Sequence, residues 1–334
     1  MNYIGSKYKL LPFIQETIYD VAGNNLSNKI LCDIFAGTGI VGRYFKTQVK
    51  KVISNDIELY SYVLNKNYIG NHCEIENINM YFNELNNISL IENGLIYKNY
   101  CIGGGKGRQY FSDFNGKKID TIRTKIEEWK NFGVINENIY YLLLCSLLES
   151  ADKLANTASV YGAFLKHLKK SASKELILQP ALFDINTNEH SVYNQDANSL
   201  ISKIKGDILY LDPPYNSRQY GSNYHLLNTI AEYREFEPKG KTGLRDYSKS
   251  KYCSKKFVST EFEYLIQNAN FKYIFLSYNN EGLMSVDEIQ QIMSKYGHYN
   301  LKQKEYQRFK ADKTSNRNHK ADSTIEYLHI LQKK

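Results

Sequence analysis

The group of residues most suited to chemistry is Asp212, Pro213, Pro214 and Tyr215, which directly follows the apolar run 208–211. The apolar run predicts a buried strand, and the prolines end it because proline cannot donate to a sheet ladder. A carboxylate and a stiffly held carbonyl can both accept hydrogen bonds from the exocyclic amino group of a nucleobase, and the tyrosine ring offers a face for stacking. The alternative interpretation is structural, namely a strand that ends in a proline turn capped by an aspartate.

A second candidate region combines two glycines with an aspartate. Residues 29–42 predict a strand, a sharp turn at Gly37 and Gly39 that permits close approach of a ligand, and a helix. The Gly-x-Gly-x-x-Gly spacing alone is weak evidence for a dinucleotide site. Asp33 ends the strand, and a carboxylate there would repel a pyrophosphate but attract a cationic or amino-acid-like ligand. Asp56 ends the next predicted strand, about 20 residues further on, where an acid commonly binds ribose hydroxyls.

Another acid stands at the end of a predicted strand in the second half of the chain. Asp196 follows this strand, and Ala197 begins a helix that leads into the apolar strand before Asp212. In an open α/β sheet, ligands bind at the carboxyl ends of the strands. We therefore expect Asp33, Asp56, Asp196 and Asp212 at the ligand-binding edge of an α/β sheet.

The elements that would position these residues form an α/β pattern with a long interruption. Strands and helices alternate before and after residues 70–190, a stretch that is rich in Asn, Lys and Tyr and mainly helical. Apolar stripes in 119–129 and 139–154 predict core helices within this stretch. At the end of the chain, 299–309 and 324–331 predict a β-hairpin.

Several basic residues are candidates for contacts with a polyanion. The formal net charge of the 334-residue chain is +8, which favours a polyanionic partner but is equally consistent with general solubility. Lys106 and Arg108 lie in a glycine-rich loop, and Lys117 is near the start of a basic helix; for each, the alternative is a plain solvated surface. Arg218 follows the Asp-Pro-Pro-Tyr group and could also contact phosphate. We interpret 70–190 as an inserted domain that contacts a polyanion.

Composition argues against several classes of protein. Hydrophobic residues make up 42% of the chain, which is enough for a sizeable core. The five cysteines show no CxxC or Cys/His spacing, so we expect neither a zinc site nor a disulfide framework, which fits a reducing compartment. The sequence has no run of roughly 18 apolar residues and no signal-peptide pattern. These observations predict a cytoplasmic protein without a metal site.

The order of these motifs resembles the Dam-like alpha group of DNA adenine methyltransferases, which use S-adenosylmethionine. The resemblance covers nearly the whole chain: an N-terminal segment with Tyr3 and Lys7, the Phe-x-Gly-x-Gly turn, the insertion, and then Asp-Pro-Pro-Tyr. It implies a Rossmann-like methyltransferase sheet with helices on both faces, formed by residues 1–69 and 191–334. It also implies that residues 70–190 are an inserted, mainly helical target-recognition domain.

The resemblance further implies roles for individual residues. The target adenine would be bound by Asp212, Pro213, Pro214 and Tyr215. The S-adenosylmethionine site would comprise Tyr3, Lys7, Asp33, Phe35, Gly37, Gly39, Asp56, Asp196 and Ala197. Within that site, Asp33 would hold the methionine part of the cofactor, Asp56 the ribose and Asp196 the adenine.

The implied function is transfer of a methyl group to the exocyclic amino group of adenine in a short duplex DNA sequence. The target base would be flipped out of the helix at a cost of a few kcal/mol. We expect duplex DNA and a cognate restriction endonuclease as partners, and a monomer in the bacterial cytoplasm. Three alternatives are an RNA adenine methyltransferase, a DNA-binding protein with a vestigial cofactor pocket, and a nucleotide-dependent oxidoreductase, which the strand-end acids disfavour.

Overall fold

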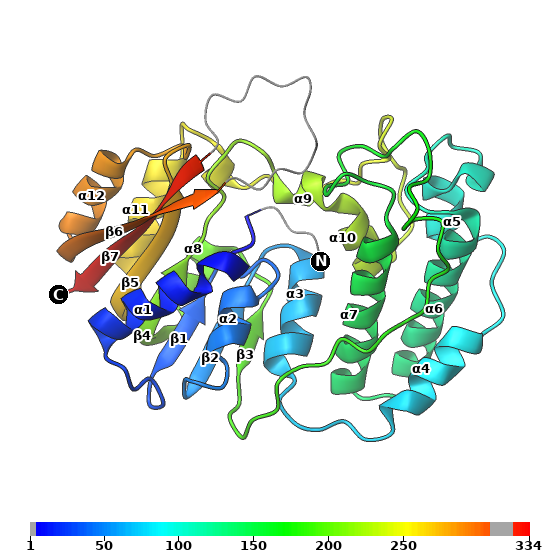
Figure 1. Cartoon of the computed structure of the whole chain (residues 1–334), viewed down its shortest axis with the longest axis horizontal. Coiled ribbons are helices and arrows are strands. Elements are labelled where there is room, and N and C mark those ends of the chain that lie inside the picture. The colour runs from blue at the N-terminus through cyan, green and yellow to red at the C-terminus, as the bar shows by residue number, and fades with distance from the viewer. Residues whose placement is uncertain (1–4, 308–322) are drawn as a thin grey trace. The chain divides into compact units, whose positions relative to one another are not determined.

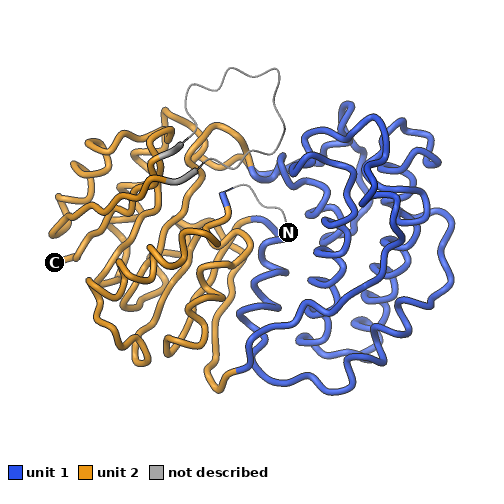
Figure 2. Tube along the Cα trace, in the orientation of Figure 1, with its two compact units in different colours: residues 1–5, 58–185, 220–248 blue, residues 6–57, 186–219, 249–334 orange. Residues whose placement is uncertain are grey.

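The computed structural model describes residues 5–307 and 323–334, which divide into two compact units (Figure 1, Figure 2). Unit 1 consists of Met1–Gly5, Glu58–Ile185 and Tyr220–Ser248. Unit 2 consists of Ser6–Ile57, Asn186–Gln219 and Lys249–Lys334. Both units are therefore assembled from segments that are far apart in the sequence.

Unit 2 contains a seven-stranded sheet in the order β3-β2-β1-β4-β5-β7-β6. The strands are β1 (Ile30–Asp33), β2 (Lys51–Asn55), β3 (Ser191–Tyr193), β4 (Lys205–Leu211), β5 (Asn270–Asn279), β6 (Gly297–Gln307) and β7 (Ser323–Lys333). The pairings among β1 to β5 are parallel, whereas β7 is antiparallel to both β5 and β6. The apolar run before Asp212 is therefore a strand inside the sheet, and the predicted terminal hairpin is confirmed as β6 and β7.

Helices cover both faces of this sheet (Figure 1). One face packs against α8 (Ala197–Ile201), α11 (Val258–Asn268) and α12 (Val286–Ser294). The strands also contact α1 (Leu11–Ala22) and α2 (Ile40–Phe45), which lie on the other face. Because successive side chains point to opposite faces, strands covered on both sides must be apolar along their whole length. This requirement explains the unbroken apolar run that the sequence shows in β4.

Unit 1 is mainly helical, and its helices share one hydrophobic core. They are α3 (Leu59–Asn65), α4 (Ile78–Asn87), α5 (Leu95–Tyr100), α6 (Asp113–Asn131), α7 (Glu137–Leu154), α9 (Tyr220–Asn223) and α10 (His225–Glu232). Single turns of tighter or wider helix are η1 (Tyr8–Leu10) and η4 (Lys251–Cys253) in unit 2, and η2 (Lys66–Gly70) and η3 (Ile102–Gly104) in unit 1. The two predicted core helices are confirmed as α6 and α7. Of the helices within the described ranges, none combines the length and the apolar character that a membrane span requires.

The bounds of the two units differ from those of the predicted domains. Unit 1 takes up residues from Glu58 onward, not only from 70, and it also includes Tyr220–Ser248. The reason is packing, because Leu226, Leu227 and Ile230 of α10 are fully buried in the core of unit 1. An apolar stripe predicts that a helix is buried on one face, but it does not identify the core that the helix joins.

Candidate active site

Neighbouring strands of unit 2 bring polar side chains together on one face of the sheet. Asp33 ends β1 and pairs with Tyr210 of β4. Asp212 stands two residues after Tyr210 and, because side chains alternate, lies on the same side. Ser277 in β5 and Glu326 in β7 belong to this face as well, since Ser277 Oγ donates a hydrogen bond to Glu326 Oε1 at 2.7 Å. The order β1-β4-β5-β7 thus gathers acids from distant parts of the chain.

Lys7 lies between two of these acids. Its Nζ is 3.2 Å from Asp212 Oδ1 and 2.7 Å from Glu326 Oε1, and its side chain is only 5% exposed. Burial acts to lower the pKa of Lys7, but the charges of Asp212 and Glu326 outweigh this effect and raise the pKa well above its ordinary value. The side chain is therefore a cation at neutral pH. We call Lys7, Asp212, Glu326 and Ser277 the Lys7 cluster.

Asp212 is poised between its charged and neutral forms. Burial raises the pKa of Asp212 to about 6, an effect that Lys7 opposes and Glu326 reinforces. In its ionised form the carboxylate can accept several hydrogen bonds in addition to the contact with Lys7. Tyr215 follows closely, and its ring packs edge-on against Tyr278 with centroids 6.4 Å apart. Between Asp212 and Tyr215, Pro213 is buried and Pro214 is half-buried.

The predicted glycine turn is present at the end of β1. Gly37 and Gly39 have backbone φ angles of 54° and 74°, which residues other than glycine rarely adopt. The Gly37 N–H donates to Asp56 Oδ2 at 2.8 Å, so the acid at the end of β2 supports the turn. Asn55 ties the adjoining strand ends together, because its side-chain amide donates to the carbonyls of Ile34 and Gln195, each at 3.0 Å.

Asp33 is the acid whose surroundings most clearly indicate a ligand. It is 1% exposed, and its Oδ1 has no hydrogen-bond partner among the residues that the structure describes. Burial raises the pKa of Asp33 well above its ordinary value, and the nearby charges of Asp212 and Asp56 raise it further. Buried polar atoms in proteins are nearly always paired. An unpaired carboxylate oxygen at a strand end therefore suits a cationic group of a ligand.

The other described residues that are predicted to bind the cofactor lie in unit 2. Asp196 is exposed and caps α8, where its Oδ1 accepts a hydrogen bond from the Ser199 N–H at 2.9 Å. Ala197 is buried at the start of that helix. Phe35 is half-buried, with its ring edge-on to that of Tyr252 at a centroid distance of 5.0 Å. Tyr3 lies outside the described residues.

The basic residues predicted to contact DNA have different surroundings. Lys106 and Arg218 are exposed. Lys117 forms an ion pair with Glu92. Arg108 is 8% exposed, and its guanidinium donates to three backbone carbonyls at 3.0 to 3.2 Å. The guanidinium of Arg108 thus holds backbone segments of unit 1 together, and its predicted contact with DNA stays a prediction.

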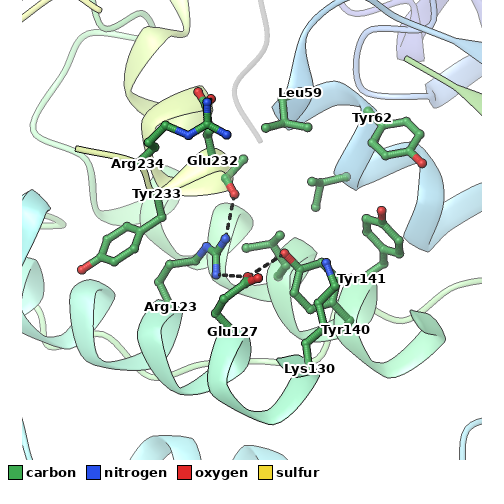
Figure 3. Close-up of a pocket in the computed structure, with 13 residues that line it drawn as sticks. Leu59, Tyr62, Arg123, Glu127, Lys130, Tyr140, Tyr141, Glu232, Tyr233 and Arg234 are labelled. Atoms are coloured by element: carbon green, nitrogen blue, oxygen red, sulfur yellow. Dashed lines mark hydrogen bonds and ion pairs between the residues drawn. The ribbon is translucent and has the colours of Figure 1, made fainter. Parts of the chain in front are cut away.

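Unit 1 has a pocket of about 430 Å³ that contains charged and tyrosine side chains (Figure 3). Arg123 donates to the carbonyls of Ile230 and Ala231 at 3.0 and 3.1 Å, and to Glu127 at 2.8 Å. The Tyr140 hydroxyl donates to the same carboxylate at 3.1 Å. We call Arg123, Glu127 and Tyr140 the Arg123 network. Its charged groups bind one another and the adjacent backbone.

Reasoning from sequence missed Glu326 and Ser277. A signal for Glu326 exists, because Leu328 and Ile330 share its side of β7 and are buried. An acid within a run of mostly apolar, buried residues indicates a buried partner, because a buried charge is costly unless it is paired. Identifying Lys7 as that partner required the structure, since the two residues are 319 positions apart.

The sheet, the glycine turn and the acids at the strand ends together define a Rossmann-like α/β fold. The family model for the D12 class N6 adenine-specific DNA methyltransferase matches residues 3–292. The chain belongs to this family. It is accordingly an adenine-specific DNA methyltransferase that uses S-adenosylmethionine.

Individual relatives agree with this assignment. The chain is 65% identical over 333 residues to Type II methyltransferase M.NlaIII of Neisseria lactamica, a match that covers 100% of this chain and 99% of that protein. It is 36% identical to Type II methyltransferase M.CviAII of Paramecium bursaria Chlorella virus 1, over 93% of each chain. It is 41% identical to Type II methyltransferase M.FokI of Planomicrobium okeanokoites, of which it spans only 53%.

Proposed function

We propose that the chain is the modification enzyme of a Type II restriction-modification system and methylates an adenine that is flipped out of a short duplex sequence. The two relatives that it matches over nearly their whole length are both named Type II methyltransferases. The observation that carries the assignment of the site is the Asp212 carboxylate, held beside Lys7 at the end of β4. Family membership favours DNA over RNA as the substrate, and methyl transfer over oxidoreduction.

In this proposal, the adenine amino group is bound by Asp212 and by the carbonyl of Pro213. The lone pair of this amino group is delocalised into the base, which makes the nitrogen a poor nucleophile. Two acceptors at the end of a rigid strand orient the N–H groups and favour localisation of the lone pair on nitrogen. Asp212 must be ionised to accept in this way, and Pro214 stiffens the turn. Tyr215 offers its ring as a stacking surface, worth roughly 1–3 kcal/mol for one base.

We propose that the cofactor site lies beside this adenine site, at the ends of β1, β2 and β3. When bound, S-adenosylmethionine supplies the methyl group from its sulfonium centre. The unpaired Oδ1 of Asp33 suits the ammonium of the methionine part, and the turn at Gly37 and Gly39 permits close approach of this part beside Phe35. We assign the ribose hydroxyls to Asp56. The adenine of the cofactor is assigned to Asp196 and Ala197.

The sequence predicts that Lys7 contacts the cofactor. Its contacts in the structure suggest a different role, in which Lys7 acts on the carboxylate of Asp212. Its Nζ contacts Asp212 and Glu326, which both lie within 3.2 Å. A neighbouring cation favours the ionised form of a carboxylate. We therefore propose that Lys7 keeps Asp212 charged and positioned for the adenine.

Unit 1 is the proposed target-recognition unit. Flipping a base costs a few kcal/mol. Contacts between phosphates and exposed cations, such as Lys106 of unit 1 and Arg218 of unit 2, would offset this cost and make binding sensitive to salt. We expect the chain to act as a monomer in the cytoplasm, where it would protect DNA from an endonuclease that cleaves the same sequence.

The test is to incubate the chain with labelled S-adenosylmethionine and a plasmid of mixed sequence, and then to map methylated bases by single-molecule sequencing. Methyl-adenine confined to one short motif is the expected result, and it would also identify that motif. Protection of the plasmid from an endonuclease with the same target would support the restriction-modification role. Methylation spread over unrelated sequences would contradict site specificity, and no label in duplex DNA would overturn the proposal.

A further inference from the structure

Glu326 is an acid inside the sheet for which the proposed reaction has no role so far. It lies in β7, is 6% exposed, and accepts hydrogen bonds from Lys7 Nζ and Ser277 Oγ, both at 2.7 Å. A buried carboxylate costs several kcal/mol unless it is paired. Replacing such a pair with apolar residues is often neutral or stabilising. Stability alone therefore gives little reason to bury this charge beside Lys7.

The geometry shows what Glu326 does to Lys7. Lys7 Nζ is closer to Glu326, at 2.7 Å, than to Asp212, at 3.2 Å. The ammonium therefore divides its charge between two carboxylates, and the three groups carry a net charge of −1 when all are ionised. Lys7 would pair with Asp212 alone if Glu326 were neutral. In this structure, therefore, Lys7 does not neutralise Asp212 alone.

Ser277 fixes Glu326 in this arrangement. Its hydroxyl comes from β5, the strand between β4 and β7. The carboxylate of Glu326 therefore accepts hydrogen bonds from two donors, Lys7 Nζ and Ser277 Oγ. Both partners of Glu326 bind the same oxygen, Oε1. This arrangement orients the acid toward Lys7 and leaves Asp212 Oδ1 as the second acceptor for the ammonium.

We infer that Glu326 is a positioning residue for methyl transfer, which shares the Lys7 ammonium with Asp212 so that Lys7 neutralises the Asp212 carboxylate only in part. The inference depends on the proposed role of Asp212 in binding the adenine amino group. A fully neutralised Asp212 would be a weaker acceptor for that amino group, and an Asp212 without Lys7 would take up a proton more readily. The net negative charge of the three groups also suits a reaction in which positive charge develops on the adenine nitrogen.

The decisive measurement is the pH profile of kcat for the Glu326→Gln variant with DNA and S-adenosylmethionine at saturation. Activity of the natural chain should fall as the pH falls through about 6, where Asp212 becomes protonated. Because the charge of Glu326 raises the pKa of Asp212, its removal should move this fall to lower pH. At pH 8 we expect kcat about tenfold lower, because Lys7 then neutralises Asp212 more fully.

The other titratable groups that interact with Asp212 stay in place in this variant. They are Lys7, Asp33, Tyr210 and Tyr215. The matched control is Glu305→Gln on the adjoining strand β6, where the carboxylate is exposed, and this variant should keep the natural profile. The variant Glu326→Asp restores the charge. It should therefore return the acid limb of the pH profile, which is the fall of kcat at low pH, toward that of the natural chain.

The outcomes separate this inference from the proposed function. An unchanged acid limb in Glu326→Gln overturns the inference, whether kcat is kept or lost, because a purely structural role would not move the titration of Asp212. If Glu326→Gln does not fold, Ser277→Ala carries the test, because it removes the second donor that orients Glu326: an altered pH profile at unchanged cofactor affinity supports the inference, and a natural profile with natural kcat overturns it. Full activity of Asp212→Ala would instead refute the site on which the inference depends.

Discussion

The Lys7 cluster of unit 2 and the Arg123 network of unit 1 both bury charged side chains, but they balance these charges differently. In the Arg123 network one guanidinium serves one carboxylate and two backbone carbonyls. Burial acts to raise the pKa of Glu127, yet Arg123 lowers it below its ordinary value. In the Lys7 cluster one ammonium serves two carboxylates, and the pKa of Asp212 rises to about 6 because burial and Glu326 outweigh Lys7.

This difference separates a structural arrangement from one prepared for a ligand. The Arg123 network is complete as it stands, so its charges favour the folded state. The Lys7 cluster, together with the unpaired oxygen of Asp33 nearby, carries excess negative charge that a cationic ligand or an amino group would relieve. Groups with pKa values shifted by burial and by like charges are typical of functional sites. Breaking the two arrangements should therefore have opposite effects on activity and stability.

The largest effect is expected for Asp212→Ala. Loss of the preorganised acceptor should reduce methyl transfer by about 100- to 1,000-fold or more. Binding of S-adenosylmethionine, measured by calorimetry, should stay within a factor of about three, since a contact of Asp212 with the cofactor is not part of the proposal. The control is Asp246→Ala in unit 1, an exposed acid with a surface ion pair, which should keep natural activity. Full activity of Asp212→Ala would refute the assignment of the catalytic site.

The next largest effect is expected for Arg123→Met, and it concerns stability. The Arg123 side chain is 4% exposed, and its removal leaves two carbonyls without their donor and Glu127 without its partner cation, while Tyr140 still donates to Glu127. Because two carbonyls would be left without a hydrogen bond, the variant should lower the free energy of unfolding by about 3 kcal/mol. Urea denaturation measures the change. Arg234→Met is the matched control, because Arg234 lines the same pocket but is 81% exposed, and it should cost at most about 1 kcal/mol.

Asp33→Asn should weaken cofactor binding while it stabilises the folded chain. A hydrogen bond to a charged group is worth about 1.5–3 kcal/mol, so affinity for S-adenosylmethionine should fall about 10- to 100-fold. Because burial raises the pKa of Asp33, the native acid destabilises the fold increasingly as the pH rises above the ordinary carboxyl range. The variant should therefore melt at a higher temperature than the natural chain at pH 8, and this gain should disappear below about pH 4.

Calorimetry and thermal melting at the two pH values check both parts of this prediction. Asp20→Asn is the control, since that acid is about half exposed and forms a surface ion pair with Lys302. It should change neither the affinity nor the melting temperature. A natural affinity in Asp33→Asn, or a lower melting temperature at pH 8, would contradict the interpretation that Asp33 is held unpaired for a ligand.

The parts of the site that could be predicted from the sequence are those encoded locally. The apolar strand before Asp212, the prolines that end it, and the glycine turn before α2 each depend on a few adjacent residues. Neighbouring parallel strands then bring Asp33 and Asp212 to the same edge of the sheet. The Lys7 cluster could not be predicted in this way, because it depends on the register between β5 and β7.

Arg108 and Tyr220–Ser248 illustrate the same limit in unit 1. An arginine in a glycine-rich loop looks exposed in the sequence, but here three carbonyls from other segments surround it. Likewise, α10 follows the Asp-Pro-Pro-Tyr strand in the chain but joins the core of unit 1. In both cases the outcome depends on tertiary contacts, which local composition does not encode.

The smallest predicted effect concerns the surface of unit 1 and contrasts two lysines. Lys106 is exposed, and no ion pair of Lys106 occurs within the described part of the chain, whereas Lys117 pairs with Glu92. If Lys106 contacts a phosphate, Lys106→Ala should weaken DNA binding by about two- to fivefold regardless of sequence, and should reduce the slope of log affinity against log salt by about 1.

Lys117→Ala should have less effect on both quantities, because its charge is already partly neutralised by a neighbour. Binding to labelled duplexes across a salt series, with fluorescence anisotropy as the readout, distinguishes the two lysines. An equal effect of both variants would mean that the ion pair with Glu92 does not limit the contact of Lys117 with DNA. No effect of Lys106→Ala would remove this lysine from the proposed DNA-binding surface, while the assignment of the catalytic cluster in unit 2 would be unaffected.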